Sequence, residues 1–240
     1  MENKVGSIKE NIEKINAMKD RAAEKAGLNG GDITLCAVTK TRSADEINEA
    51  IKAGVTDIGE NKVQEILDKF DHVDSVKWHM IGHLQTNKVK YIIDKVSLIH
   101  SVDSLHLAEE IDRRAAQQGK VMDILIQLNP AMEESKFGAA LEDTGGLIRE
   151  ILEKCSNIRI KGLMCMTPFE DDPEDTAAYY AEVKALYDRY SQEIKHERLD
   201  FTTLSMGMSH DFETAVKEGS NMIRVGTAIF GERNYNKTGG

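Results

Sequence analysis

Lys40 is the residue with the clearest potential for covalent chemistry in this sequence. It closes the apolar run ITLCAVTK at residues 33–40 and is followed at once by TRSADEI, which has the composition of a helix start. Desolvation lowers the pKa of a lysine, so an amine at the mouth of a β/α structure can be neutral and attack an aldehyde. A lysine after a strand can also be only its solvated end. Lys40 is therefore a candidate for Schiff-base chemistry that needs support from elsewhere in the chain.

A second cluster of candidate residues lies in the segment LSMGMSHDFETAVKEGSNMIRVGTAIFG, residues 204–231. Two stretches in it combine small and hydroxyl side chains after an apolar run: Ser205, Gly207 and Ser209 in the first, and Gly226 and Thr227 in the second. Hydroxyls and closely approaching backbone N–H groups before a helix favour an anion, and barrels commonly hold phosphate in such loops. In one loop, a helix cap and turn glycines would explain the pattern. Two adjacent loops favour a phosphate site.

Arg224 is a charged residue inside the short apolar run MIRVG at residues 222–226. Successive side chains of a strand face opposite sides, so Ile223 and Val225 would face the helices and Arg224 the interior. A buried guanidinium needs a partner. The sequence leaves two partners open: a carboxylate such as that of Glu60, in a structural ion pair, or a bound ligand.

Further candidate ligand contacts lie in or just after three other apolar runs. They are Asn61, His83, Met164 and Met166. Asn61 could instead cap a helix, and methionines are common core residues. His79 and His83 are four residues apart, but they fall in and just after an extended run, where that spacing separates them too far for one ion. We therefore predict no metal site at this pair.

Eight apolar runs alternate with helix-like segments along the chain. They occupy residues 33–40, 55–60, 76–82, 96–103, 121–129, 158–166, 201–207 and 222–226. Strands that alternate with amphipathic helices predict parallel pairing through right-handed crossovers, and eight such strands can close a barrel. The length of 240 residues is near the roughly 250 typical of one (β/α)8 barrel. We predict a single α/β domain over residues 1–240, a TIM barrel, with an open doubly wound sheet as the alternative.

Segments outside the predicted strands complete this organisation. Residues 1–27 are expected to form an additional helix, which covers the face that a helix after the eighth strand would occupy. Residues 234–240 are expected to be a disordered tail, and the longest loop, residues 129–146, to lie over the site. Predicted helix starts have a capping residue followed by acids: Ser43, Asp103, Asp172 and Ser209.

Composition and charge restrict the setting in which the protein works. The three cysteines, Cys36, Cys155 and Cys165, fit no metal-binding or redox spacing and are expected to be buried thiols in the cytoplasm. The chain starts with a charged segment and has no apolar stretch of membrane-spanning length, so neither export nor membrane insertion is expected. The net charge of −10 disfavours a nucleic-acid partner. We expect a monomer.

The ordered motifs resemble the YggS/PROSC family of pyridoxal 5′-phosphate (PLP) homeostasis proteins. The resemblance spans about residues 33–233 and rests on AVTKTRSADEI, DIGENKVQE, WHMIGHLQTNK, EESKFG, GLMCM, LSMGMSHDF and RVGTAIFGER. It implies the barrel of the alanine racemase N-terminal domain and a Schiff base between Lys40 and the aldehyde of PLP. Arg224 would face the pyridine nitrogen. The phosphate would be held by Ser205, Gly207, Ser209, Gly226 and Thr227, and the ring would be flanked by Asn61, His83 and Met164. Met206 would also belong to the cofactor site.

The resemblance implies a protein of intracellular PLP (vitamin B6) homeostasis, which buffers the cofactor or delivers it to PLP-dependent apoenzymes. An arginine beside the pyridine nitrogen disfavours its protonation and weakens the ring as an electron sink, and we expect no second domain to supply another base, so little or no turnover is expected. A racemase-like PLP enzyme of low activity is the alternative. A third hypothesis is a cofactor-free aldolase that uses a mid-strand lysine, Lys161. Lys136 in EESKFG is a further motif lysine whose role the sequence leaves open.

Overall fold

The computed structural model describes residues 6–133 and 137–232, which form a closed barrel of eight parallel strands. The strands are β1 Thr34–Val38, β2 Asp57–Glu60, β3 Lys77–Met80, β4 Leu98–Val102, β5 Met122–Leu128, β6 Ile158–Cys165, β7 Leu199–Ser205 and β8 Met222–Val225. Neighbours in sequence are neighbours in the barrel, and β8 pairs with β1. The predicted (β/α)8 barrel is confirmed, and the open sheet is wrong.

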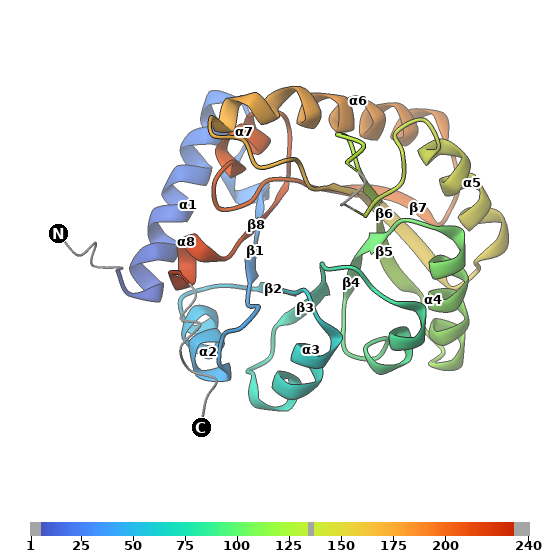
Figure 1. Ribbon diagram of the computed structural model, residues 1–240, viewed down its shortest axis with the longest axis horizontal. Helices are drawn as coiled ribbons and strands as arrows, with labels where there is room; N and C mark the ends of the chain where they lie inside the picture. The colour runs from blue at the N-terminus through green and yellow to red at the C-terminus, as the bar shows by residue number, and fades with distance from the viewer. Residues whose placement is uncertain (1–5, 134–136, 233–240) are drawn as a thin grey trace.

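Helices surround the ring of strands (Figure 1). The α-helices are α1 Ile8–Lys25, α2 Ala44–Lys52, α3 Val63–Lys69, α4 Leu105–Gln117, α5 Thr144–Lys154, α6 Ala177–Glu193, α7 Phe212–Lys217 and α8 Thr227–Phe230. In the part of the chain that the structure describes, four 3-10 helices accompany them: η1 Gly30–Asp32, η2 Phe70–His72, η3 Thr86–Tyr91 and η4 Pro173–Thr176. Because every strand is parallel, the loops that follow the strands meet at one end of the barrel, where (β/α)8 proteins place their sites.

The N-terminal helix α1 packs beside α8, α7 and α2, next to the closing pair of β1 and β8 (Figure 1). A capping box of Ser7 and Glu10 fixes its start. The amide of Asn11 donates a hydrogen bond to the carbonyl of Ile229 at 2.8 Å, which ties α1 to α8. The predicted position of this helix is confirmed, although it begins at Ile8 and ends at Lys25. Residues 1–5 and the predicted tail, residues 234–240, lie outside the described residues.

Some of the predicted helix starts differ in the structure. Ser43 forms a capping box with Glu46, and the side chain of Asp172 caps the start of η4. The cap position of α4 is Ser104 rather than Asp103. Ser209 does not cap α7, whose cap position is Asp211. The hydroxyl of Ser209 bonds instead to the loop after β8, as described below.

The core has two layers. A large apolar layer lies between strands and helices, and a small apolar cluster fills the barrel interior with Cys36, Leu98, Leu125, Met164 and Met222. All three cysteines are buried and free, as predicted. Burial raises the pKa of the Cys155 thiol to about 11 and that of Cys165 to about 12. Within the described residues, no helix combines the length and apolarity needed to cross a membrane.

Candidate functional site

Lys40 lies in the turn between β1 and α2, half-buried, at the end of the barrel where the strands terminate. The strand ends at Val38, so the prediction that it runs through Lys40 is wrong. The chain cannot stay extended here, because Thr41, the residue after Lys40, has a φ of 65° in the left-handed region. That conformation costs a β-branched residue roughly 1–2 kcal/mol, and it persists only where neighbouring contacts hold it.

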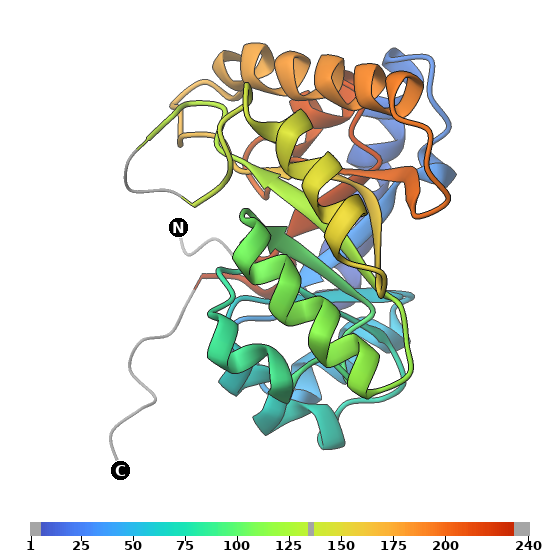
Figure 2. The same cartoon turned by 90° about the vertical axis from the view of Figure 1, so that its right-hand side faces the viewer.

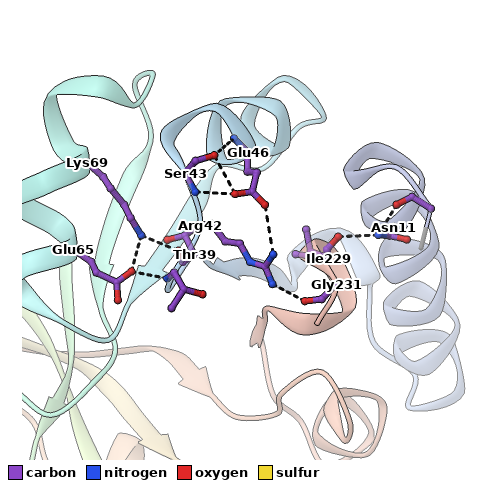
Figure 3. Close-up of polar contacts among 11 residues, drawn as sticks. Asn11, Thr39, Arg42, Ser43, Glu46, Glu65, Lys69, Ile229 and Gly231 are labelled. Carbon is purple, nitrogen blue, oxygen red and sulfur yellow. Dashed lines mark hydrogen bonds and ion pairs between the residues drawn. The ribbon is translucent and has the colours of Figure 1, made fainter. Parts of the chain in front are cut away.

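Lys69 supplies those contacts from α3 (Figure 3). Its amine donates to the carbonyl of Thr39 at 3.0 Å and to the carboxylates of Glu60 at 2.8 Å and Glu65 at 2.7 Å. Glu65 in turn accepts a hydrogen bond from the backbone N–H of Thr41 at 2.6 Å. The residues on both sides of Lys40 are therefore fixed to the same cluster of charges.

Arg42 holds the other side of the same turn (Figure 3). Its guanidinium donates to the carbonyl of Gly231 at 2.6 Å and lies 3.5 Å from the carboxylate of Glu46 at the start of α2. Gly231 follows α8 directly. The turn that carries Lys40 is thus joined to the segment after β8, which contains the predicted phosphate residues.

The two predicted phosphate loops are in direct contact. The hydroxyl of Ser209, after β7, accepts hydrogen bonds from the backbone N–H groups of Gly226 at 3.2 Å and Ala228 at 3.4 Å, after β8. Gly226 also packs against β1, since a Cβ atom added to it would lie 3.1 Å from the Cβ of Val38. Thr227 is exposed beside it. Hydroxyl and N–H groups therefore gather beside the strand end that precedes Lys40, where Gly226 and Val38 pack closely.

Gly207 shapes the first of these loops. Its φ is +90°, and an added Cβ would lie 2.6 Å from the Cβ of Ala215 and 2.8 Å from the Cα of Phe212. The neighbouring Met206 is fully buried in the outer apolar layer. The loop therefore presents backbone at Gly207, whereas the side chain of Met206 contributes to packing.

Arg224 is buried in the barrel interior, as the strand alternation predicts. Its guanidinium donates to the hydroxyl of Ser205 at 2.7 Å and to the carbonyl of Cys165 at 2.8 Å. Glu60 is not its partner, because Glu60 bonds to Lys69 and to the hydroxyl of Thr39. The reason is the alternation of side chains along β2. Gly59 faces the interior, since a Cβ added to it would lie 3.0 Å from the Sγ of Cys36, and the following residue, Glu60, therefore faces outward.

The predicted ring contacts occupy different environments. Asn61 follows β2, and its Oδ1 atom is buried without a hydrogen-bond partner among residues 6–133 and 137–232. Met164 lies in the interior cluster. His83 is exposed and stacks on Phe137, with ring centroids 3.7 Å apart, so it lies against the loop after β5. The described parts of that loop extend beyond the end of the barrel (Figure 2). Lys136 lies outside the described residues.

Sequence analysis did not place three polar residues in the barrel interior, although it considered one of them, His79, as half of a metal pair with His83. Asp57, His79 and His100 are all buried. A carboxylate oxygen of Asp57 lies 3.1 Å from Nε2 of His79, whose Nδ1 lies 3.0 Å from Nε2 of His100. The Nδ1 atom of His100 lies 3.2 Å from the hydroxyl of Ser205. The strand alternation that placed Arg224 inward could have placed these residues inward as well.

The model of the family described as alanine racemase, N-terminal domain, matches residues 6–234. The pyridoxal phosphate homeostasis protein of Aquifex aeolicus is 40% identical over 228 residues, which cover 94% of this chain and 98% of the relative. The chain belongs to the alanine racemase N-terminal domain family. The resemblance to pyridoxal phosphate homeostasis proteins that the motifs indicated is thereby confirmed.

Solved structures of this family agree with the barrel described above. PipY of Synechococcus elongatus PCC7942 without PLP is 32% identical, with a TM-score of 0.82 over 94% of this chain and 100% of PipY. The structure of PipY with PLP bound is 33% identical, with a TM-score of 0.76 over 89% of this chain and 100% of PipY.

Proposed function

We propose that this protein binds PLP and takes part in intracellular PLP homeostasis by buffering the cofactor or delivering it. One observation carries the proposal: Gly226 packs on Val38, so the Ser209 and Gly226 loops lie beside the strand end that precedes Lys40. An amine and an anion site that adjoin one another match the aldehyde and phosphate of one small molecule. The homologues named pyridoxal phosphate homeostasis protein and PLP-bound PipY support the same cofactor.

The donor set of the site fits PLP. Lys40 offers the amine that takes the aldehyde, and Ser209, Gly226 and Thr227, with the backbone at Gly207, offer hydroxyl and N–H groups for phosphate. The buried Oδ1 atom of Asn61, which has no hydrogen-bond partner in the described part of the chain, is an acceptor that a ligand donor could use. We place Arg224 at the ring nitrogen, with Met164 beneath the ring, His83 as an outer contact and Met206 contributing through its backbone only.

Arg224 also bears on turnover. PLP supports carbanion chemistry when its pyridine nitrogen is protonated and the ring acts as an electron sink. The guanidinium of Arg224 is buried, and a second positive charge next to it would be repelled. The site therefore favours reversible tethering of the cofactor with little or no catalytic turnover. We further propose that the protein acts as a cytoplasmic monomer and that PLP-dependent apoenzymes are its recipients.

The experiment that tests PLP binding compares purified wild-type protein with Lys40→Ala and Lys161→Ala after incubation with PLP and gel filtration. Lys161 is a matched control because its amine is paired with Asp200, away from the strand ends. Wild type and Lys161→Ala should gain visible absorbance and, after borohydride, one pyridoxyl adduct on Lys40, whereas Lys40→Ala should gain neither. A wild-type protein that takes up no PLP would refute the proposal. A borohydride-trapped triose adduct on Lys161, formed without bound PLP, would instead support the aldolase hypothesis.

Turnover and delivery are tested separately on the loaded protein. Deuterium exchange at Cα of a panel of amino acids should not exceed that of free PLP, and Lys40-dependent exchange would favour the racemase-like alternative. Delivery predicts that the loaded protein activates a PLP-dependent apoenzyme faster than the free PLP it releases, measured with a phosphatase present to destroy PLP in solution. Equal rates would exclude direct transfer.

A further inference from the structure

A line of hydrogen-bonding side chains crosses the barrel interior from β2 to β8. Its members come from five strands: Asp57 of β2, His79 of β3, His100 of β4, Ser205 of β7 and Arg224 of β8. The successive contacts measure 3.1, 3.0, 3.2 and 2.7 Å. Every one of these residues is at most 4% exposed. Such a buried polar line is costly unless each group is satisfied, so its members are matched to one another.

When both histidine rings are neutral, the Asp57 carboxylate, which only accepts, fixes the direction of every hydrogen bond in the line. Arg224 has only donors, so it donates to the oxygen of Ser205, which leaves the hydroxyl proton of Ser205 for Nδ1 of His100. Neutral His100 then carries its proton on Nε2 and donates to Nδ1 of His79. His79 likewise carries its proton on Nε2 and donates to the carboxylate of Asp57, which only accepts. All donors therefore point from Arg224 towards Asp57.

The charge states of the groups agree with this direction. Burial, followed by the charges of His79 and Arg224, lowers the pKa of His100 well below its ordinary value, which keeps the ring neutral. Burial alone would raise the pKa of Asp57, but hydrogen bonds from His79 and Thr56 and the charges of His79 and Lys77 lower it. A carboxylate at one end and a guanidinium at the other are thus joined through two histidines and a serine.

We propose that Asp57, His79, His100 and Ser205 are positioning residues that orient the guanidinium of Arg224 and, through it, set the electronic state of a ligand at the barrel mouth. The proposal rests on the proposed function for the identity of that ligand, PLP. In this arrangement the hydroxyl of Ser205 is occupied by Arg224 and His100. Ser205 therefore binds Arg224 rather than the phosphate, and the phosphate loop consists of the residues from Gly207 onward.

These five residues could instead have a purely structural role. Substitutions of His100 distinguish that role from the positioning role that we propose. Glutamine offers a carbonyl acceptor towards Ser205 and an amide donor towards His79, as neutral histidine does, whereas leucine fills space and offers neither. Under the proposal, His100→Gln keeps the direction of the line and His100→Leu breaks it. If packing alone matters, the two variants behave alike.

The first test uses the protein without any cofactor and so does not depend on the proposed function. Nitrogen-15 NMR of histidine-labelled protein at neutral pH should show His79 and His100 as neutral rings protonated on Nε2. In His100→Gln, His79 should keep this tautomer, and in Ser205→Ala the His100 resonances should shift. A His79 or His100 ring that is doubly protonated, or protonated on Nδ1, would overturn the proposal.

The second test uses PLP-loaded protein and compares Asp57→Asn with Asp123→Asn. Asp123 is a matched control, because it is an aspartate of strand β5 that pairs with Arg159 outside the line. Asp57→Asn and His100→Leu should shift the visible absorbance band of bound PLP and weaken PLP binding about fivefold or more, from a hydrogen bond lost at a charged group. Asp123→Asn and His100→Gln should match wild type. Identical spectra and affinities for all four variants would overturn the proposal, whereas a wild type that takes up no PLP refutes the proposed function alone.

Discussion

The hydroxyl of Ser209 accepts the backbone N–H of Gly226 at 3.2 Å and thereby joins the loops that follow β7 and β8. The same N–H groups are the ones that a bound phosphate would use. A serine in this position can rotate its hydroxyl to donate to the anion, because hydroxyl groups both accept and donate. The two loops are thus held near each other before the ligand arrives, which lowers the entropy lost on binding.

Ser209→Ala should weaken PLP binding about tenfold, because one hydrogen bond to a charged group is lost and the two loops are no longer joined. The measurement is a fluorescence or absorbance titration with PLP. Ser191→Ala is the matched control, since the hydroxyl of Ser191 bonds within α6 to the carbonyl of Asp188, and it should bind as wild type does. Equal affinities of Ser209→Ala and wild type would contradict the role of this loop.

Lys69→Met should destabilise the protein by about 2–4 kcal/mol, because it leaves the buried carboxylate of Glu60 without its counter-charge. Burial raises the pKa of Glu60 even with Lys69 present. Denaturant unfolding measures the loss, and Lys69→Met with Glu60→Leu should recover part of it. Lys184→Met, which removes an i,i+4 pair with Asp188 on α6, should cost less than about 1 kcal/mol. Similar losses in both single variants would contradict the importance of the Lys69 cluster.

Gly207→Ala should cost about 2–4 kcal/mol, because the φ of +90° disfavours any L side chain and the new methyl group would collide with Ala215. Gly146→Ala is the control. Gly146 lies within α5, and an added Cβ there has no atom within 4 Å, so the substitution should stabilise the helix by about 0.5–1 kcal/mol. The opposite order of stabilities would show that the loop after β7 can rearrange freely.

Acid should destabilise the fold through His100. Its folded-state pKa lies well below the ordinary 6.5, so as pH falls below that value the unfolded chain takes up a proton that the folded chain refuses. The stability that a neutral His100 allows is therefore fully present above pH 6.5 and is lost as pH falls towards the folded-state pKa. The slope for one such group approaches roughly 1.4 kcal/mol per pH unit.

The check compares denaturant unfolding at about pH 7.5 and about pH 5.5 in wild type and His100→Gln. The variant should lose less stability on acidification, because glutamine does not titrate. His106→Gln, at an exposed position of α4, should lose as much as wild type. An unchanged pH dependence in His100→Gln would show that the folded barrel accepts a charged ring at this position.

Much of the fold follows from the sequence because parallel strands that are buried on both faces appear as continuous apolar runs. The same reasoning placed Arg224 in the interior. Its hydrogen-bond partner could not be read from the sequence, since Ser205 and Arg224 meet only when β7 and β8 lie side by side. The end of β1 was missed for a tertiary reason, because the left-handed Thr41 is held by Glu65 of α3, which Lys69 holds in turn.

His100 shows the remaining limit of sequence reasoning. The alternation of its strand predicts an inward side chain, but a lone inward histidine can be a core residue, a ligand contact or part of a network. Only the convergence of β3, β4 and β7 brings His79 and Ser205 to its two nitrogens. Long-range register, rather than local pattern, decides which of these roles a buried histidine has.

Pairing between β1 and β8 has a consequence for how the protein is made. Thr34 aligns with Met222 and Ala37 with Val225, so the barrel closes only through contacts between residues far apart in the sequence. Such contacts form slowly, because a long loop must close before they contribute. A chain emerging from the ribosome presents Lys40 early and the Ser209 and Gly226 loops late. Under the proposed function, the nascent chain therefore carries the Lys40 amine without the anion site until β8 has been synthesised and has paired with β1, so that capture of PLP would begin only at the last step of folding.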